Sequence, residues 1–175
     1  AYFSRVGRKG TGLSPPISGS EEFIFTKSSG EVRHPRTNEV LPPRPLFGSP
    51  PAVKTDADPR QALAMWMMGK ENNFFPAVMV NRVWADLMGR GIVEPVDDIR
   101  ESNPPSNKEL LEALALHFRE LNYDLKALLK TILASRVYSL SSHPNERNIA
   151  DTRNYSRYYR QRLRAEVLLD GVCDI

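Results

Sequence analysis

Cysteine, histidine and long hydrophobic runs are all scarce in this sequence of 175 residues, and each shortage excludes a class of protein. The one cysteine, Cys173, cannot form an internal disulfide, a four-cysteine zinc site or the C-x-x-C-H motif that attaches haem. No apolar run approaches the roughly 18 residues that a membrane-spanning helix requires. We therefore expect no membrane span and no cofactor bound by this part of the protein.

The net charge of the sequence is also small. The sequence has 24 lysines and arginines against 21 aspartates and glutamates, which leaves a net charge of +3. This excess is too small for the dense basic surface of a strong nucleic-acid-binding protein. The histidines, His34, His117 and His143, lie on different expected elements, and no two have the spacing of metal ligands. The sequence therefore indicates no metal site and does not favour nucleic acid as a partner.

The composition is that of an ordinary globular domain. Hydrophobic residues make up 41% of the sequence and charged residues 26%, so a core can form. More than half of the 14 prolines precede residue 60, which predicts an extended N-terminal part. We expect an irregular segment over 1–21, a β-hairpin over 22–34 and a proline-rich connector over 35–57. Because the sequence ends within an apparent helix, we interpret it as a fragment of a longer protein.

Helical periodicity begins after the connector. Each expected helix follows a residue type that commonly caps a helix, and glycine or asparagine often stands at its end. Five helices are expected: one capped by Asp58 that ends at Gly69, one from about Phe75 to Met88, one capped by Ser106 that ends at Asn122, one capped by Asp124, and one from near Asn154 to the end. The sequence thus predicts a mainly α fold, an irregular bundle of about five helices with a small N-terminal hairpin, and a single helical domain over 22–175.

The stretch between the second and third expected helices carries a dense group of carboxylates. Glu94, Asp97 and Asp98 could form a metal site or an acid–base pair. They could instead cap helices and pair with Arg90 and Arg100, and structural ion pairs of this kind are common. The spacing matches no calcium-binding loop and no histidine lies nearby in the sequence. We therefore favour the structural role.

The helix before this stretch contributes further polar and aromatic side chains. Asn81 lies beside apolar rows and is expected to point inward, where a buried amide requires hydrogen-bond partners. A loop over 92–104 would offer free backbone carbonyls. We therefore favour a helix that holds the loop by hydrogen bonds over a ligand-binding site. The full candidate cluster comprises Asn81, Arg82, Trp84, Arg90, Glu94, Asp97, Asp98, Arg100 and Asn103.

A second candidate surface is the run RNYSRYYRQRLR at residues 153–164, which has five arginines and three tyrosines. Arginines interleaved with aromatic residues can bind nucleic acid or another polyanion. In the helix expected here, however, the tyrosines continue an apolar row while Arg157, Arg160 and Arg164 lie on another face. An amphipathic helix packed on a core explains most of this pattern. Anion binding through the three arginines is the weaker hypothesis.

Several segments together resemble one known family. They are GEVRHPRT at 30–37, PPRPLFG at 42–48, NRVW at 81–84, GRGIVEPVDDIR at 89–100, SNPPS at 102–106, ELLEALA at 109–115, NYDLKALLKTILASRVYSLSS at 122–142 and RLRAEVLLD at 162–170. The resemblance covers roughly residues 22–175. In these segments the sequence resembles the planctomycete-specific C-terminal domain of unknown function. That family forms the C-terminal domain of large exported proteins, which often carry a cytochrome-c-like domain in their N-terminal part.

The resemblance implies an exported parent protein of several domains, located in the periplasm or at the cell surface. Any haem would belong to another part of that parent. The other domains of the parent are the partners it implies, with polysaccharide as a further candidate. The family supplies no catalytic residues to transfer to this sequence.

Three functional hypotheses follow. The first is a non-catalytic structural or interaction module of an exported multidomain protein. The second is an enzymatic or carbohydrate-handling domain with a carboxylate cleft over Glu94–Arg100. The third is anion or nucleic-acid binding through the arginine-rich segment 153–164. We favour the first.

Overall fold

The computed structural model describes residues 1–10, 22–49 and 57–174. Within these residues the chain forms five helices and a two-stranded antiparallel sheet, which confirms the expected mainly helical class. The chain divides into two compact units, Ala1–Asn72 and Asn73–Ile175. The division falls inside the range expected to be one domain, and the extent of an independently folding domain stays a prediction.

The hairpin of the first unit differs from the expected one. Strand β2 (Glu22–Thr26) pairs with β1 (Val6–Gly10), which lies in the segment expected to be irregular. The expected partner at residues 31–34 makes only an isolated bridge, between Arg33 and Val40. A Cβ added at Gly7 would lie 2.5 Å from the Phe25 ring, so the glycine gives this ring room to cover the neighbouring strand.

Helix α1 (Pro59–Met67) begins at the predicted cap. The Asp58 carboxylate accepts a hydrogen bond from the backbone N–H of Arg60 at 2.9 Å, and Pro59 occupies the first helical position. The Arg60 side chain also donates to this carboxylate and holds the pKa of Asp58 well below its usual range. Trp66 donates its Nε1–H to the carbonyl of Phe47 at 3.0 Å, which ties the helix to the connector before it.

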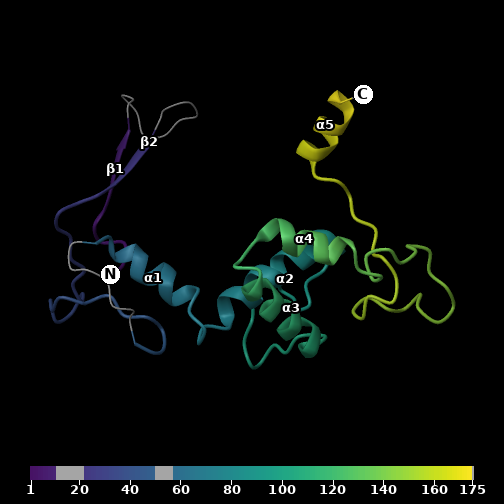
Figure 1. Cartoon of the computed structure of the whole chain (residues 1–175), viewed down its shortest axis with the longest axis horizontal. Helices are drawn as coiled ribbons and strands as arrows, with labels where there is room; N and C mark the ends of the chain where they lie inside the picture. Colours follow the sequence, from purple (N-terminus) through teal and green to yellow (C-terminus); the bar gives the residue numbers. More distant parts are fainter. Residues whose placement is uncertain (11–21, 50–56, 175) are drawn as a thin grey trace. The chain divides into compact units, whose positions relative to one another are not determined.

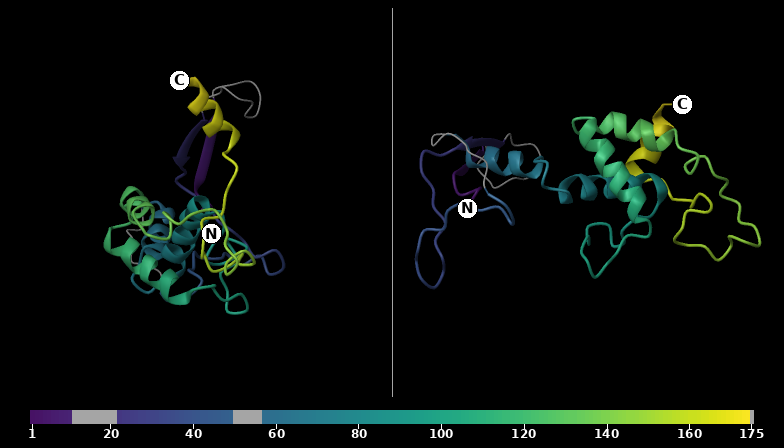
Figure 2. Two further views of the ribbon diagram at one scale, coloured as in Figure 1. Left: turned by 90° about the vertical axis from the view of Figure 1, so that its right-hand side faces the viewer. Right: turned by 60° about the horizontal axis from the view of Figure 1, so that its bottom comes forward.

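Three helices form the core of the second unit. Helices α2 (Phe74–Met88), α3 (Lys108–Glu120) and α4 (Leu125–Leu133) pack against one another (Figures 1 and 2). The buried cluster between them and the segments that follow comprises Val80, Trp84, Met88, Ile92, Val93, Leu111, Phe118, Leu128, Ile132 and Tyr155. Part of this core therefore comes from the loop after α2 and from the segment after α4.

The ends of these helices follow local chemistry. Gly89 ends α2 with a left-handed φ of 78°, and Asn122 follows α3 with a φ of 51°, both as predicted. The Asp124 carboxylate accepts from the first free N–H groups of α4, also as predicted. The predicted cap of α3 was wrong by one residue, because Asn107 accepts from the N–H of Leu110. Ser106 instead donates its hydroxyl to the carbonyl of Ile92 at 3.0 Å.

The fifth helix is shorter than expected. Residues 153–164, all of them described, form no helix, and α5 covers only Ala165–Cys173. Tyr155 has a φ of 54°, which a right-handed helix cannot contain. The Asp151 carboxylate accepts from the N–H groups of Arg153, Asn154 and Ser156, and these bonds close a turn in place of a helical turn. In Figure 2 this part of the chain runs as an irregular segment between α4 and α5.

Among the residues that the structure describes, no helix combines the length and the apolar character required to cross a lipid bilayer.

Candidate functional site

The loop between α2 and α3 is hydrogen-bonded to one buried side-chain amide. Asn81 on α2 is 0% exposed. Its Nδ2 donates to the carbonyls of Val93 at 2.9 Å and Val96 at 2.7 Å, and its Oδ1 accepts from the N–H of Val93 at 3.0 Å. The side chain thus gives these backbone groups of the loop the hydrogen-bond partners that they would otherwise lack. These are the hydrogen bonds that the sequence led us to expect.

A glycine makes this arrangement possible. A Cβ added at Gly91 would lie 2.3 Å from the carbonyl oxygen of Val93 and 3.0 Å from Nδ2 of Asn81. Any larger residue would push the loop away from the amide that holds it. Gly91 is therefore required for close approach, although its φ is not in the left-handed region.

The carboxylates of the loop each have a separate partner. Asp97 accepts two hydrogen bonds from Arg82, from Nε at 2.7 Å and Nη2 at 2.8 Å, and these bonds lower the pKa of Asp97 and raise that of Arg82. Glu94 accepts from the N–H of Gly91 at 3.0 Å. Both members of the Arg82–Asp97 pair are exposed, so screening by solvent keeps its contribution to stability small.

In the second half of the loop, contacts form among Asp98, Arg100 and Asn103. Arg100 lies 3.0 Å from the Asp98 carboxylate. Asn103 donates its Nδ2 to the carbonyl of Asp98 at 2.9 Å and makes an isolated β-bridge with Arg100. Among the described residues, no group of three or more histidine, cysteine, aspartate or glutamate side chains is placed to hold a metal ion. Carboxylates with these separate partners act as hydrogen-bond acceptors that shape the loop.

Trp84 and Arg90 both contact Tyr155, a residue that the candidate cluster predicted from the sequence did not include. Tyr155 lies in the core, and its hydroxyl donates to the carbonyls of Arg90 at 3.0 Å and Gly91 at 2.7 Å. Its ring meets the buried Trp84 edge to face, with the centroids 5.3 Å apart. Burial raises the pKa of Tyr155 to about 12. Since 64 residues separate Tyr155 from Gly91, no local spacing could have indicated the contact.

The three arginines proposed to bind anions do not share a helical face. Arg157 lies over the ring of Tyr159, with its guanidinium carbon 5.2 Å from the centroid. Arg160 donates to the Ser142 hydroxyl at 3.0 Å. Arg164 pairs with Asp86 on α2 at 2.6 Å. Each therefore has its own contact along an irregular segment, and binding of anions by these residues stays a prediction.

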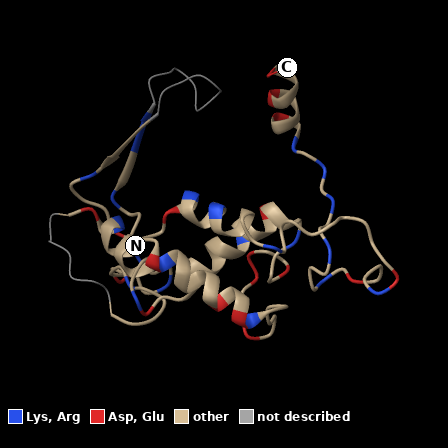
Figure 3. Ribbon diagram, turned by 45° about the vertical axis from the view of Figure 1, so that its right-hand side comes forward, with Lys and Arg blue, Asp and Glu red and all other residues tan. Residues whose placement is uncertain are grey.

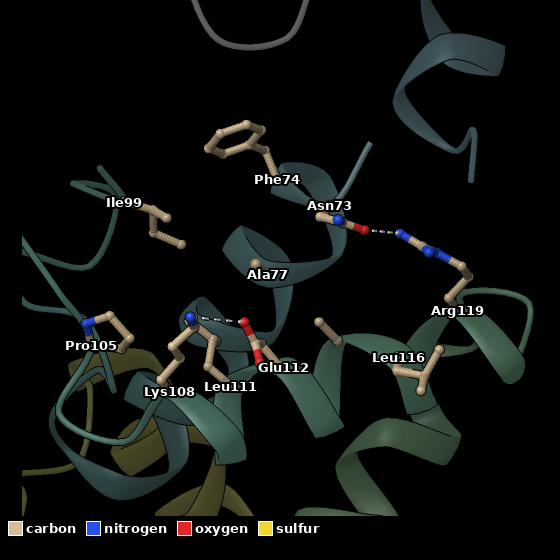
Figure 4. A pocket seen from close by; sticks show the side chains of 11 residues that line it. Asn73, Phe74, Ala77, Ile99, Pro105, Lys108, Leu111, Glu112, Leu116 and Arg119 are labelled. Carbon is tan, nitrogen blue, oxygen red and sulfur yellow. Dashed lines mark hydrogen bonds and ion pairs between the residues drawn. The ribbon is translucent and has the colours of Figure 1, made fainter. Parts of the chain in front are cut away.

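A groove that the sequence did not predict lies along α3. It has a volume of about 440 Å³ and is lined mainly by apolar side chains from the start of α2, the loop and the outer side of α3. Two polar contacts lie among its lining residues, Lys108 with Glu112 and Arg119 with Asn73 (Figure 4). A smaller pocket of about 360 Å³ lies beside Trp84 and Tyr155.

Comparison with known protein families gives a match that covers more than half of the chain. The model of the family described as PSD1, Protein of unknown function (DUF1553), matches residues 59–175. This range contains the whole loop, its anchors Asn81 and Tyr155, and the groove. No curated protein and no solved structure gives a significant match to the chain.

Proposed function

The chain belongs to the PSD1 family of proteins of unknown function (DUF1553), and from this premise we propose that it is a non-catalytic structural or interaction module. The parent is then an exported protein of several domains, located in the periplasm or at the cell surface. Its planctomycete origin and a cytochrome-c-like domain elsewhere in the parent are part of the same proposal, which rests on the sequence resemblance. Any haem would be bound by that other domain.

One observation carries the proposal. Asn81, the most deeply buried polar side chain of the candidate cluster, makes all three of its hydrogen bonds to the backbone of the loop. A residue placed to act on a substrate keeps a donor or acceptor turned toward a cleft. The polar residues around Asn81 follow the same pattern, since Arg82 binds Asp97 and Asn103 binds the carbonyl of Asp98. These three side chains, Asn81, Arg82 and Asn103, bind their own loop.

A turnover assay tests this proposal against the enzymatic alternative. The purified chain is incubated with a panel of plain and sulfated polysaccharides, and new reducing ends are measured. The matched controls are Asp97→Asn and Asp98→Asn, which keep the side-chain shape and remove the charge. We expect no release above the level of the two variants. Release that the wild-type chain shows and either variant loses would assign a catalytic role to the loop carboxylates and overturn the proposal.

A further inference from the structure

The positive charge of the chain is concentrated in the segment between α4 and α5. Residues 136–164 contain seven arginines, no lysine and two carboxylates, Glu146 and Asp151, which gives this segment a net charge of +5. Since the whole sequence carries +3, the remaining residues together are slightly negative. Figure 3 shows basic residues along this segment where it leads to α5. A small net charge for the whole sequence is thus compatible with one strongly basic segment.

Six of the seven arginines have no acidic partner. Arg164 pairs with Asp86 on α2 at 2.6 Å, and it is the one arginine of this segment that makes an ion pair within the described residues. Five of the other six are exposed, and Arg157 is half-buried. We call these six residues the arginine surface: Arg136, Arg147, Arg153, Arg157, Arg160 and Arg162.

The two carboxylates of the segment leave these arginines unpaired. Asp151 accepts from the backbone N–H groups of Arg153 at 2.9 Å and Asn154 at 2.8 Å, so it closes a turn instead of binding a guanidinium. Glu146 is exposed and makes no ion pair with these arginines in the part of the chain that the structure describes. Like charges gathered on one surface repel one another, which lowers the stability of the folded chain. A bound polyanion would remove this repulsion.

Contacts within the segment hold its early and late parts together. Arg160 donates to the Ser142 hydroxyl at 3.0 Å, and Asn148, the neighbour of Arg147, donates its Nδ2 to the carbonyl of Ser156 at 3.3 Å. Residues 158–164 form neither a helix nor a turn, so successive arginines are spaced along an extended run. The arginine surface therefore presents its guanidinium groups along a line, which suits a partner with repeated negative charges.

Arginine matches such a partner in geometry as well as in charge. Its planar guanidinium has five N–H donors and forms paired hydrogen bonds with oxyanions such as carboxylate and phosphate. A lysine ammonium has no such fixed geometry, and the segment contains no lysine. The composition of the surface thus favours a polymer whose charged groups are oxyanions.

The tyrosines of the segment argue against single-stranded nucleic acid as that polymer. Bases bind surfaces of this kind by stacking on free aromatic rings. The ring of Tyr158 meets that of Tyr138 edge to face, with the centroids 5.5 Å apart, and the guanidinium of Arg157 lies over the ring of Tyr159. Tyr155 is buried in the core. Each tyrosine of residues 136–164, all of them described, thus packs against another part of the chain.

We infer that the arginine surface binds an acidic polysaccharide. Such a polymer carries oxyanions along an extended chain and has no bases that require a stacking partner. Duplex nucleic acid is read by a helix or a ribbon of strands in its major groove, and residues 136–164 form neither. The inference rests on the proposed function, because it names the partner of an interaction module.

Binding of labelled oligosaccharides tests the inference. The full chain is titrated at low salt into fluorescein-labelled fragments of heparin, which carry sulfate groups, and of polygalacturonate, which carry carboxylates, and fluorescence anisotropy is measured. A labelled dextran fragment of similar length is the uncharged control. A single-stranded oligonucleotide and a poly-glutamate peptide with the same number of charges represent the other classes of polyanion.

Two double variants separate the arginine surface from general charge. The first combines Arg153→Gln and Arg162→Gln, because both side chains are exposed and neither guanidinium makes a hydrogen bond or an ion pair within the described residues. The fold therefore loses no contact. The matched control combines Lys126→Gln and Lys130→Gln, which removes the same charge from exposed positions on α4.

We expect at least one of the two acidic oligosaccharides to bind and dextran not to bind, with an affinity that falls steeply as salt is added. The arginine variant should bind several-fold more weakly and with a shallower dependence on salt, while the lysine variant should bind as the wild-type chain does.

Three results would overturn the inference: no binding of either acidic oligosaccharide, equal weakening in the two double variants, or tighter binding of the oligonucleotide or of poly-glutamate. The turnover assay measures new reducing ends and depends on the loop carboxylates, which both double variants retain. Failure of polysaccharide binding and failure of the module proposal are therefore distinguishable.

Discussion

Asn81 and Tyr155 show how single polar side chains determine the path of the chain in the second unit. Each sits in the core and directs its polar atoms at backbone groups near Gly91 and Val93. A buried backbone carbonyl or N–H without a partner costs about 1–3 kcal/mol, so each side chain stabilises more than its own position. Both residues bind the loop after α2. Asn81 precedes this loop in the sequence, and Tyr155 follows it.

The first prediction concerns Asn81. Asn81→Leu keeps the number and branching of the side-chain heavy atoms but leaves the N–H of Val93 and the carbonyls of Val93 and Val96 without their partner. We expect the free energy of unfolding to fall by about 2–5 kcal/mol, measured by urea denaturation. The control is Arg82→Leu, which removes an exposed ion pair and should cost much less. Equal losses in the two variants would argue against the clamp.

The second prediction concerns the pH dependence of Tyr155. Its pKa is raised to about 12 in the folded chain, and an unfolded tyrosine has a pKa of about 10. The folded chain thus holds the proton more tightly, and this contribution to stability is complete below pH 10 and is lost as pH rises toward 12. Tyr155→Phe should have a lower melting temperature at pH 7, because it removes the hydroxyl whose proton is shared between the carbonyls of Arg90 and Gly91.

The same variant provides the test of that pH dependence. Between pH 10 and pH 12 the melting temperature of Tyr155→Phe should fall less than that of the wild-type chain. The difference between the two chains isolates Tyr155 from the other groups that titrate in this range. Parallel curves for the two chains would contradict the assignment.

At the scale of elements, the sequence predicted those features that depend on neighbouring residues. The start of α1 and α4 at Asp58 and Asp124 and the end of α2 at Gly89 follow from capping chemistry within one turn. The partner of β2 and the start of α5 depend on contacts between distant residues. Local periodicity assigned Tyr155 to a helix, but its buried hydroxyl contact with Gly91 prevailed over helix propensity.

The candidate cluster also contains some contacts that the sequence could predict and others that it could not. The inward orientation of Asn81 could be predicted, since an amide beside apolar rows requires partners. The choice of Arg82 as the partner of Asp97 could not be predicted, because the turn of the loop brings the two together across 15 residues. Glu94 illustrates a further difficulty. Its partner is the backbone N–H of Gly91, which no side-chain pattern indicates.

The third prediction concerns the cap of α3. Asn107→Ala removes the acceptor for the N–H of Leu110 and should lower the free energy of unfolding by about 1 kcal/mol. Asn107→Asp is the control, because it keeps the accepting oxygen and adds a charge that favours the helix N-terminus. It should leave stability unchanged or raise it. An unchanged stability in Asn107→Ala would show that this helix start does not depend on its cap.

At the scale of the whole molecule, the chain consists of two compact units, and the candidate loop, its anchors and the groove all belong to the second. The second unit contains α2, α3 and α4 and the buried cluster between them. All residues of this buried cluster belong to the second unit. This organisation makes the second unit an autonomous candidate for the role of a module.

The fourth prediction follows from this division. A fragment of residues 73–175 should fold alone, with a helical circular dichroism spectrum and one cooperative thermal transition. Asn81→Leu introduced into this fragment should lower its melting temperature, as in the full chain. A fragment that shows helical signal without a cooperative transition would mean that the first unit completes the core.

The central claim is that the loop after α2 is a clamped structural element, and amide hydrogen exchange at Val93 tests it most directly. The N–H of Val93 donates to the buried Oδ1 of Asn81, so it should exchange only when the second unit unfolds as a whole. Its free energy of opening should then equal the free energy of unfolding measured with urea. Exchange of the Val93 amide as fast as that of exposed loop amides would contradict the account, since a loop that opens independently is not held by Asn81.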